Sequence, residues 1–145
     1  MNLKKILLVE DNPDDELLTM RALEKYNLAN EVDVVRDGAE ALDYVFCRGA
    51  YEQRDPSDTP QLILLDLKLP KLDGIEVLKE IKKDENNRNI PVVMLTTSRE
   101  EGDMLRSYEN GANSYIQKPV DFKEFVEVVS QLGIYWLAIN KVPNG

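Results

Sequence analysis

The sequence contains no histidine among its 145 residues. Without an imidazole, the chain cannot form a Ser-His or Cys-His pair or a histidine metal site, and it cannot carry phosphoryl groups on histidine. Its single cysteine, Cys47, rules out an intramolecular disulfide. We expect Cys47 to be a small buried side chain. Any phosphoryl group that this protein handles must therefore come from a donor outside the chain.

Long apolar runs and excess positive charge are also missing. The longest apolar run, 132–139, is eight residues with Gly133 inside it, which is far shorter than a membrane span. Only four apolar residues follow Lys5 before Glu10, too few for a signal peptide. The net charge of −9 argues against nucleic acid or an anionic membrane as a partner. We therefore expect a cytoplasmic protein that binds neither nucleic acid nor a membrane.

The length suits one domain with one core, and we expect this domain to span residues 1–145. Short apolar segments alternate with stretches of helical periodicity. Such alternation predicts an α/β protein: a doubly wound, five-stranded parallel sheet of the flavodoxin-like (βα)5 type. The predicted strands are 3–9, 32–35, 62–66, 92–96 and 114–117.

Each predicted helix has an apolar face that should pack on the sheet. The residues expected to face inward are, helix by helix, Leu18, Ala22 and Tyr26; Leu42, Val45 and Phe46; Ile75, Leu78 and Ile81; Met104, Leu105 and Tyr108; and Phe122, Phe125, Val126, Val129 and Leu132. Asp11 to Asp15 should start the first helix. The polar segment 48–61 predicts an extended helix end followed by a long loop.

Four of the strands end on residues that can handle a phosphoryl group: Glu10 and Asp11, Asp66, Thr96, and Lys118. The carboxyl ends of parallel strands meet at one edge, where open α/β sheets place their sites. Three hard carboxylate ligands favour Mg²⁺, or Mn²⁺, over zinc. Asp66 is the natural nucleophile, while Thr96 and Lys118 can bind phosphoryl oxygens.

Each of these residues also has an ordinary structural explanation. An aspartate such as Asp11 after a strand is often a helix cap, Thr96 could simply end a strand, and Lys118 could be solvated. Their joint placement at successive strand ends is harder to explain in this way. We therefore interpret the set as one site.

This set resembles the motifs of response regulator receiver domains. The separations of 30 residues from Asp66 to Thr96 and 22 from Thr96 to Lys118 match the family pattern. Further similarities are Leu69-Pro70, Gly74, Gly111-Ala112, Tyr115 and Lys118-Pro119. The resemblance covers essentially the whole chain.

The resemblance implies a single-domain response regulator of a two-component phosphorelay. Asp66 would accept a phosphoryl group from the phosphohistidine of a sensor histidine kinase. Mg²⁺ would be held by Glu10, Asp11, Asp66 and the backbone carbonyl of Lys68. The protein would not be an enzyme in the usual sense, since it would catalyse only its own phosphorylation and dephosphorylation.

The resemblance also implies the parts of a conformational switch. Thr96 and Lys118 would bind the phosphoryl group, and Tyr115 would move inward as Thr96 is pulled toward it. Lys118-Pro119 would be a cis peptide. Lys68 and Ser98, at variable positions beside the site, would tune the lifetime of the acyl phosphate.

The chain departs from the family norm in two places. Glu10 replaces the more frequent aspartate, and the segment 48–61 makes the region before Asp66 longer by about ten residues. This insertion, the Asp11-Asn12-Pro13 start and the aromatic C-terminus resemble stand-alone regulators that are paired with bacterial phytochromes. A phytochrome-type kinase is therefore the expected partner class.

The last predicted helix stays apolar on every side from Ile134 to Ile139. One sheet face cannot bury such a helix end. The inserted loop or a neighbouring helix could cover it, or Tyr135 and Trp136 could anchor a homodimer or partner interface. No output domain is expected after this helix, so the signal should leave through the receiver surface.

Other classes remain as alternatives. A Mg²⁺-dependent small-molecule phosphatase or phosphotransferase could also use Asp66, but such enzymes need a second acid where this chain has Lys68. A toprim-type nuclease meets the same obstacle. A flavodoxin-like FMN protein needs a phosphate-binding turn after the first strand, and this turn is acidic. A binding module with an inactive site is the last alternative, although no essential residue is missing.

Overall fold

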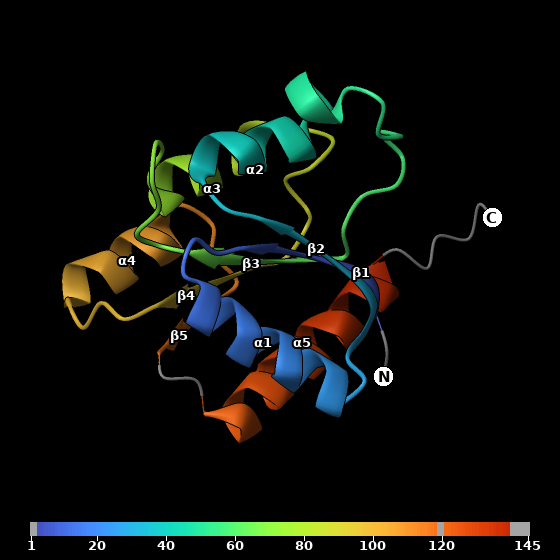
Figure 1. Cartoon of the computed structure of the whole chain (residues 1–145). Coiled ribbons are helices and arrows are strands. Elements are labelled where there is room, and N and C mark those ends of the chain that lie inside the picture. Colours follow the sequence, from blue (N-terminus) through green and yellow to red (C-terminus); the bar gives the residue numbers. More distant parts are fainter. Residues whose placement is uncertain (1–2, 119–120, 140–145) are drawn as a thin grey trace.

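A computed structural model of the chain describes residues 3–118 and 121–139, and the side chains of Phe122 and of residues 133–139 lie outside the description. Five parallel strands form one sheet in the order β2-β1-β3-β4-β5 (Figure 1). This arrangement confirms the predicted doubly wound fold. The strands are β1 (Leu3–Val9), β2 (Ala29–Val35), β3 (Leu62–Asp66), β4 (Val92–Thr96) and β5 (Ser114–Gln117).

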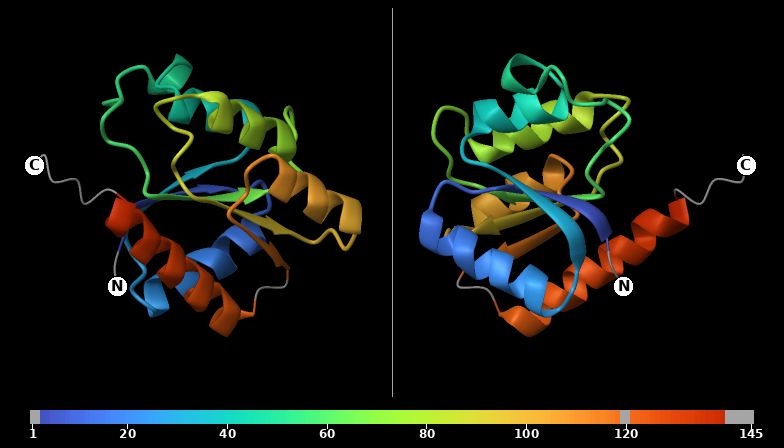
Figure 2. Two further views of the ribbon diagram at one scale, coloured as in Figure 1. Left: turned by 180° about the vertical axis from the view of Figure 1, so that it is seen from behind. Right: turned by 45° about the vertical axis from the view of Figure 1, so that its right-hand side comes forward.

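The helices cover both faces of the sheet. Their bounds are α1 (Pro13–Lys25), α2 (Gly38–Val45), α3 (Gly74–Lys83), α4 (Glu101–Glu109) and α5 (Phe122–Ile139). Helices α1 and α5 lie side by side on one face, and α2 and α3 cover the other (Figures 1 and 2). None of the helices in the described part of the chain is long and apolar enough to cross a membrane.

The central strands β1, β3 and β4 are buried on both faces, which explains their continuous apolar sequences. Beneath α1 and α5, Phe125 and Val129 are fully buried in the core. On the other face, the expected residues of α3, including Leu78 and Ile81, are buried against the sheet. These inward positions were predicted correctly.

Other predicted inward positions were wrong. Leu18 and Tyr26 of α1 are 46% and 40% exposed, because Thr19, Ala22 and Leu23 form the buried side of that helix instead. Strand β2 begins at Ala29, earlier than predicted. In α4 the expected apolar face, made of Met104, Leu105 and Tyr108, is exposed.

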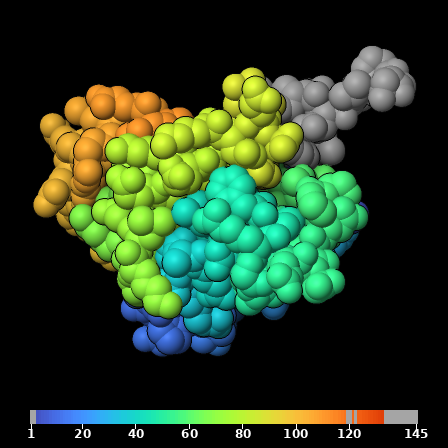
Figure 3. All heavy atoms as spheres, turned by 90° about the horizontal axis from the view of Figure 1, so that it is seen from above, coloured from blue at the N-terminus to red at the C-terminus, as the bar shows by residue number. Residues whose placement is uncertain are grey.

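The segment 48–61 does not extend α2. Helix α2 ends at Val45, and Cys47, only partly buried, takes a left-handed backbone with φ of 53°. A short 3₁₀ helix η1 (Gly49–Tyr51) and a loop follow. The segment then packs beside α2 on the outer face (Figure 3), in the colours from cyan to green.

Arg54 fastens this inserted segment to α2. Its guanidinium donates to the carbonyl oxygens of Tyr44 at 2.9 Å and Asp58 at 2.5 Å and lies 4.3 Å from the centre of the Tyr44 ring. The Tyr44 carbonyl belongs to the last turn of α2, where the regular helical bonds end, and it otherwise accepts a long bond of 3.3 Å from the Cys47 N–H. The insertion thus satisfies the end of the helix that precedes it.

A second set of contacts joins the insertion to the sheet. The buried ammonium of Lys5 in β1 donates to Asp58 at 2.7 Å and lies 3.8 Å from Asp33 in β2. The Tyr44 hydroxyl donates to Asp33 at 2.5 Å. These contacts place paired charges along β2, one of the two edge strands of the sheet.

Candidate functional site

The predicted site residues meet at the carboxyl edge of the sheet. Glu10 follows β1, Asp66 ends β3, Thr96 ends β4 and Lys118 follows β5. The backbone N–H of Lys118 donates to the Thr96 carbonyl at 2.8 Å, which continues the strand pairing up to the site. Glu10, Asp66, Thr96 and Lys118 are all buried, whereas Asp11 is exposed.

Lys118 holds the carboxylates together. Its Nζ donates to Glu10 Oε1 at 2.5 Å and to Asp66 Oδ2 at 3.2 Å. It also donates to Asp15 Oδ2 at 3.0 Å. Three acids thus contact one ammonium, and Asp11 lies close to Glu10 and Asp66, so this edge of the sheet carries an excess of negative charge.

The sequence identified Asp15 only as a first-turn helix residue, and its place in the site was missed. Asn12 caps α1 by accepting from the backbone N–H groups of Asp14 and Asp15. This cap fixes the first turn so that Asp15 faces Lys118. One feature of the sequence could have placed Asp15 in the site. It lies in the first turn of the helix that follows β1, and side chains of such a turn remain close to the end of the strand.

The site favours the binding of a cation. Oxygen atoms of Glu10, Asp11 and Asp66 lie within 4.8 Å of one another. Burial, together with the nearby charge of Asp66, raises the pKa of Glu10 to about 7, although Lys118 works in the opposite direction. Burial by itself would lower the pKa of Lys118, but its contacts with Glu10, Asp66 and Asp15 raise it. A hard dication fits this donor set, because it would offset the remaining negative charge.

Close backbone packing positions Asp66. Gly74 begins α3, and a Cβ added there would lie 2.3 Å from the Asp66 carbonyl oxygen. The Gly74 N–H donates to the carbonyl of Leu67 at 2.9 Å. The backbone N–H of Lys68 donates to Asp66 Oδ1 at 3.3 Å, which orients the carboxylate. The first turn of α3 therefore needs glycine in order to approach the backbone at Asp66 and Leu67.

The predicted switch residues lie on the other side of Asp66. Thr96 is completely buried, and its Oγ1 accepts from the backbone N–H of Ser98 at 3.1 Å. Tyr115 is half-buried, and its hydroxyl points toward the Ser98 carbonyl at 3.4 Å. Pro119, and with it the predicted cis peptide, lies outside the described residues, as do the side chains of Tyr135 and Trp136.

Comparison with known proteins decides the family. The model of the response regulator receiver domain family matches residues 6–130. The chain belongs to this family. Response regulators act in two-component signalling, in which phosphorylation by a histidine kinase is the general role of the receiver domain.

Two curated relatives of this receiver align with nearly all of the chain. The probable methanogenesis regulatory protein FilR2 of Methanothrix harundinacea is 44% identical over 96% of this chain and 87% of its own length. The response regulator Rcp1 of Synechocystis is 41% identical over 97% of this chain and 93% of its own. The predicted resemblance to receivers is therefore confirmed.

Solved receiver structures agree in fold. The bacteriophytochrome response regulator AtBRR shares 57% identity with a TM-score of 0.80, covering 92% of this chain and 95% of that chain. The phosphorylated cyanobacterial phytochrome response regulator RcpA shares 43% identity, a TM-score of 0.78 and coverage of 97% and 99%. The Mn²⁺-bound form of Rcp1 shares 42% identity, a TM-score of 0.77 and coverage of 92% and 94%.

Proposed function

We propose that this receiver accepts a phosphoryl group on Asp66 from the phosphohistidine of a sensor kinase. The observation that carries the proposal is the meeting of the buried Glu10, Asp66 and Lys118 with the exposed Asp11 at one edge of the sheet. The phosphorylated form of the relative RcpA supports it. The alternative of a small-molecule phosphatase is weaker, because Lys68 stands where a general acid is needed.

In the proposed reaction an Asp66 oxygen attacks phosphorus and the P–N bond breaks. The imidazole leaves with the electron pair of that bond and keeps the proton on its other nitrogen, so it departs as a neutral ring. Glu10, Asp11, Asp66 and the Lys68 carbonyl would hold Mg²⁺ or Mn²⁺, which would neutralise charge on the transferring group. Lys118 would turn from Asp66 to a phosphoryl oxygen as a second positive charge. Thr96 would donate its hydroxyl hydrogen to another oxygen.

The chain would catalyse only its own phosphorylation and dephosphorylation. Incubation with Mg²⁺ and acetyl phosphate, followed by intact mass measurement, tests this proposal. We expect a single phosphoryl adduct in the wild type and in Asp55→Asn, a control that changes an exposed carboxylate of the insertion. Failure of the wild type to form an adduct, or an undiminished adduct in Asp66→Asn, would contradict it.

We further propose that the kinase is of the phytochrome type and that the reaction takes place in the cytoplasm. The names of AtBRR and RcpA support the phytochrome partner, whereas the name of FilR2 points to another process. We expect faster phosphotransfer from a purified bacteriophytochrome kinase than from an unrelated histidine kinase, and the measured transfer rates test this partner class. Faster transfer from the unrelated kinase would contradict this partner class.

A homodimer through the end of α5 remains our proposal for the output surface. The support is the sequence around Tyr135 and Trp136, which is apolar on every side. Sedimentation of the phosphorylated and unphosphorylated protein tests it. A folded Trp136→Ala variant that sediments like the wild type in both states would contradict it.

A further inference from the structure

Helix α4 is held to the protein mainly by polar contacts. Its buried residues are Asp103 and Ser107, while its large apolar side chains are exposed. The helix also starts weakly, since its N-cap Glu100 makes no side-chain cap bond and Gly102 occupies the first turn. The position of α4 therefore depends on the partners of its buried polar side chains.

Asp103 is the centre of these contacts. Its side chain is 3% exposed and lies near one hydroxyl and two cations. Ser98 Oγ donates to Oδ2 at 2.6 Å, Arg106 donates to Oδ1 at 2.5 Å, and the ammonium of Lys68 is 3.7 Å away. The hydrogen bonds from Ser98 and Arg106 lower the pKa of Asp103, so it is a charged acceptor.

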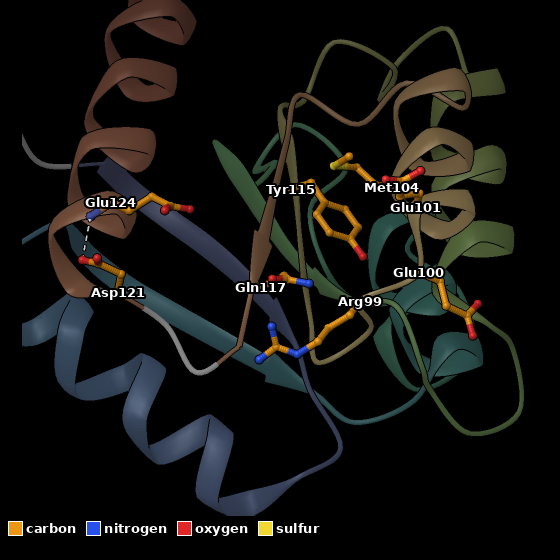
Figure 4. Close-up of a pocket in the computed structure, with 8 residues that line it drawn as sticks. All are labelled: Arg99, Glu100, Glu101, Met104, Tyr115, Gln117, Asp121 and Glu124. Carbon is orange, nitrogen blue, oxygen red and sulfur yellow. Dashed lines mark hydrogen bonds between the residues drawn. The ribbon is translucent and has the colours of Figure 1, made fainter.

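Ser98 connects this carboxylate to the predicted switch. Its backbone N–H donates to Thr96 Oγ1 at 3.1 Å. Its carbonyl accepts from Gln117 at 3.0 Å and, more weakly, from the Tyr115 hydroxyl at 3.4 Å. Figure 4 shows Tyr115 and Gln117 of β5 directed toward the loop that precedes α4. A displacement of Thr96 or Tyr115 must therefore move Ser98 or break its bonds.

We propose that Asp103 is a positioning residue that holds Ser98, and through it Thr96, in the unphosphorylated conformation. This inference rests on the proposed function, because it concerns the regulation of phosphoryl binding at Asp66. The Asp103–Ser98 bond opposes the shift of Thr96 toward a phosphoryl group. It thereby lowers the affinity of the resting protein for that group.

The direction of the effect follows from a two-state equilibrium. A contact made in only one conformation stabilises that conformation, and its loss shifts the population toward the other. A hydrogen bond to a charged group is strong enough for its loss to change such an equilibrium about tenfold. A purely structural role for Asp103 predicts the opposite sign, since a loosened protein binds more weakly.

Binding of beryllofluoride, a phosphoryl mimic, to the full chain with saturating Mg²⁺ tests the inference by calorimetry. We expect Ser98→Ala to bind about tenfold more tightly than the wild type, and Ser98→Thr, which keeps the hydroxyl, to restore wild-type affinity. Asp103→Asn should bind more tightly, while Glu101→Gln, which removes a charge from the same turn, should not. The affinity for Mg²⁺ alone should be equal in all four variants.

Several results would overturn the inference. Ser98→Ala could bind beryllofluoride no more tightly than the wild type, or Glu101→Gln could gain as much affinity as Asp103→Asn. A change in Mg²⁺ affinity could account for the tighter binding. The gains of Ser98→Ala and Asp103→Asn could also add up in the double variant. Bonded partners instead predict that the double variant binds no more tightly than Ser98→Ala. The proposed function fails separately if the wild type does not bind beryllofluoride or if Asp66→Asn binds it equally well.

Discussion

The buried carboxylate of Glu10 should make the metal-free protein less stable as the pH rises. The pKa of Glu10 is raised from 4.5 to about 7, mainly by burial. The folded state therefore binds this proton more tightly than the unfolded state. The resulting stabilisation is complete below pH 4.5 and is lost as the pH rises through 7.

The expected size of the loss follows from the two pKa values. The difference between 4.5 and about 7 corresponds to about 3 kcal/mol of unfolding free energy. Other groups titrate over the same range, so the relevant quantity is the difference between the wild type and Glu10→Gln. The amide cannot ionise, and this variant should lack that part of the pH dependence.

Urea denaturation at pH 4.5, 6, 7 and 8 in EDTA measures this difference, with Asp14→Asn as the control. Asp14 is an exposed acid of the neighbouring helix start, and its replacement should leave the pH profile of the wild type unchanged. Saturating Mg²⁺ should remove the loss in the wild type, because metal binding requires the ionised carboxylate. Parallel profiles of wild type and Glu10→Gln in EDTA would refute the reasoning.

Three further predictions concern packing. Gly74→Ala should reduce phosphorylation of Asp66 by acetyl phosphate at least tenfold and lower stability, because its Cβ would lie 2.3 Å from the Asp66 carbonyl oxygen. Intact mass measures the phosphorylation and urea curves measure the stability. Normal phosphorylation of the variant would contradict this prediction. Phe125→Ala should cost about 3–5 kcal/mol of unfolding free energy, since Phe125 is fully buried, and a loss below about 1 kcal/mol would be inconsistent with this packing. Arg54→Ala should cost about 1–3 kcal/mol because the carbonyls of Tyr44 and Asp58 lose their bonds from the guanidinium. Unchanged urea curves would show that these bonds do not stabilise the insertion.

The main site could be predicted because strand ends fix it. Once Glu10, Asp66 and Lys118 were placed after three strands of one parallel sheet, topology alone brought them to a common edge. Asp15 could not be placed in the same way. Its direction depends on the cap at Asn12 and on the rotation of α1, which the strand pattern does not determine.

The wrong assignment of the α4 face has a related cause. Met104, Leu105 and Tyr108 have the spacing of an inward face, yet Asp103 and Ser107 are the buried residues. Helix α4 packs beside α3 and β5 rather than over the centre of the sheet (Figure 1). Hydrogen bonds with the loop at Ser98 then decide which side of the helix faces inward, and hydrophobic periodicity carries no information about them.

The charges along β2 have a consequence for self-association. An edge strand has unpaired backbone groups that can recruit a strand from another molecule, and charged side chains on the edge oppose such pairing. Glu31 and Asp33 provide this charge on β2, and Lys5 beneath them neutralises part of it without leaving the interior. Asp58 of the insertion also pairs with Lys5, so the net charge along this edge stays negative and opposes the pairing of β2 with a strand of a second molecule.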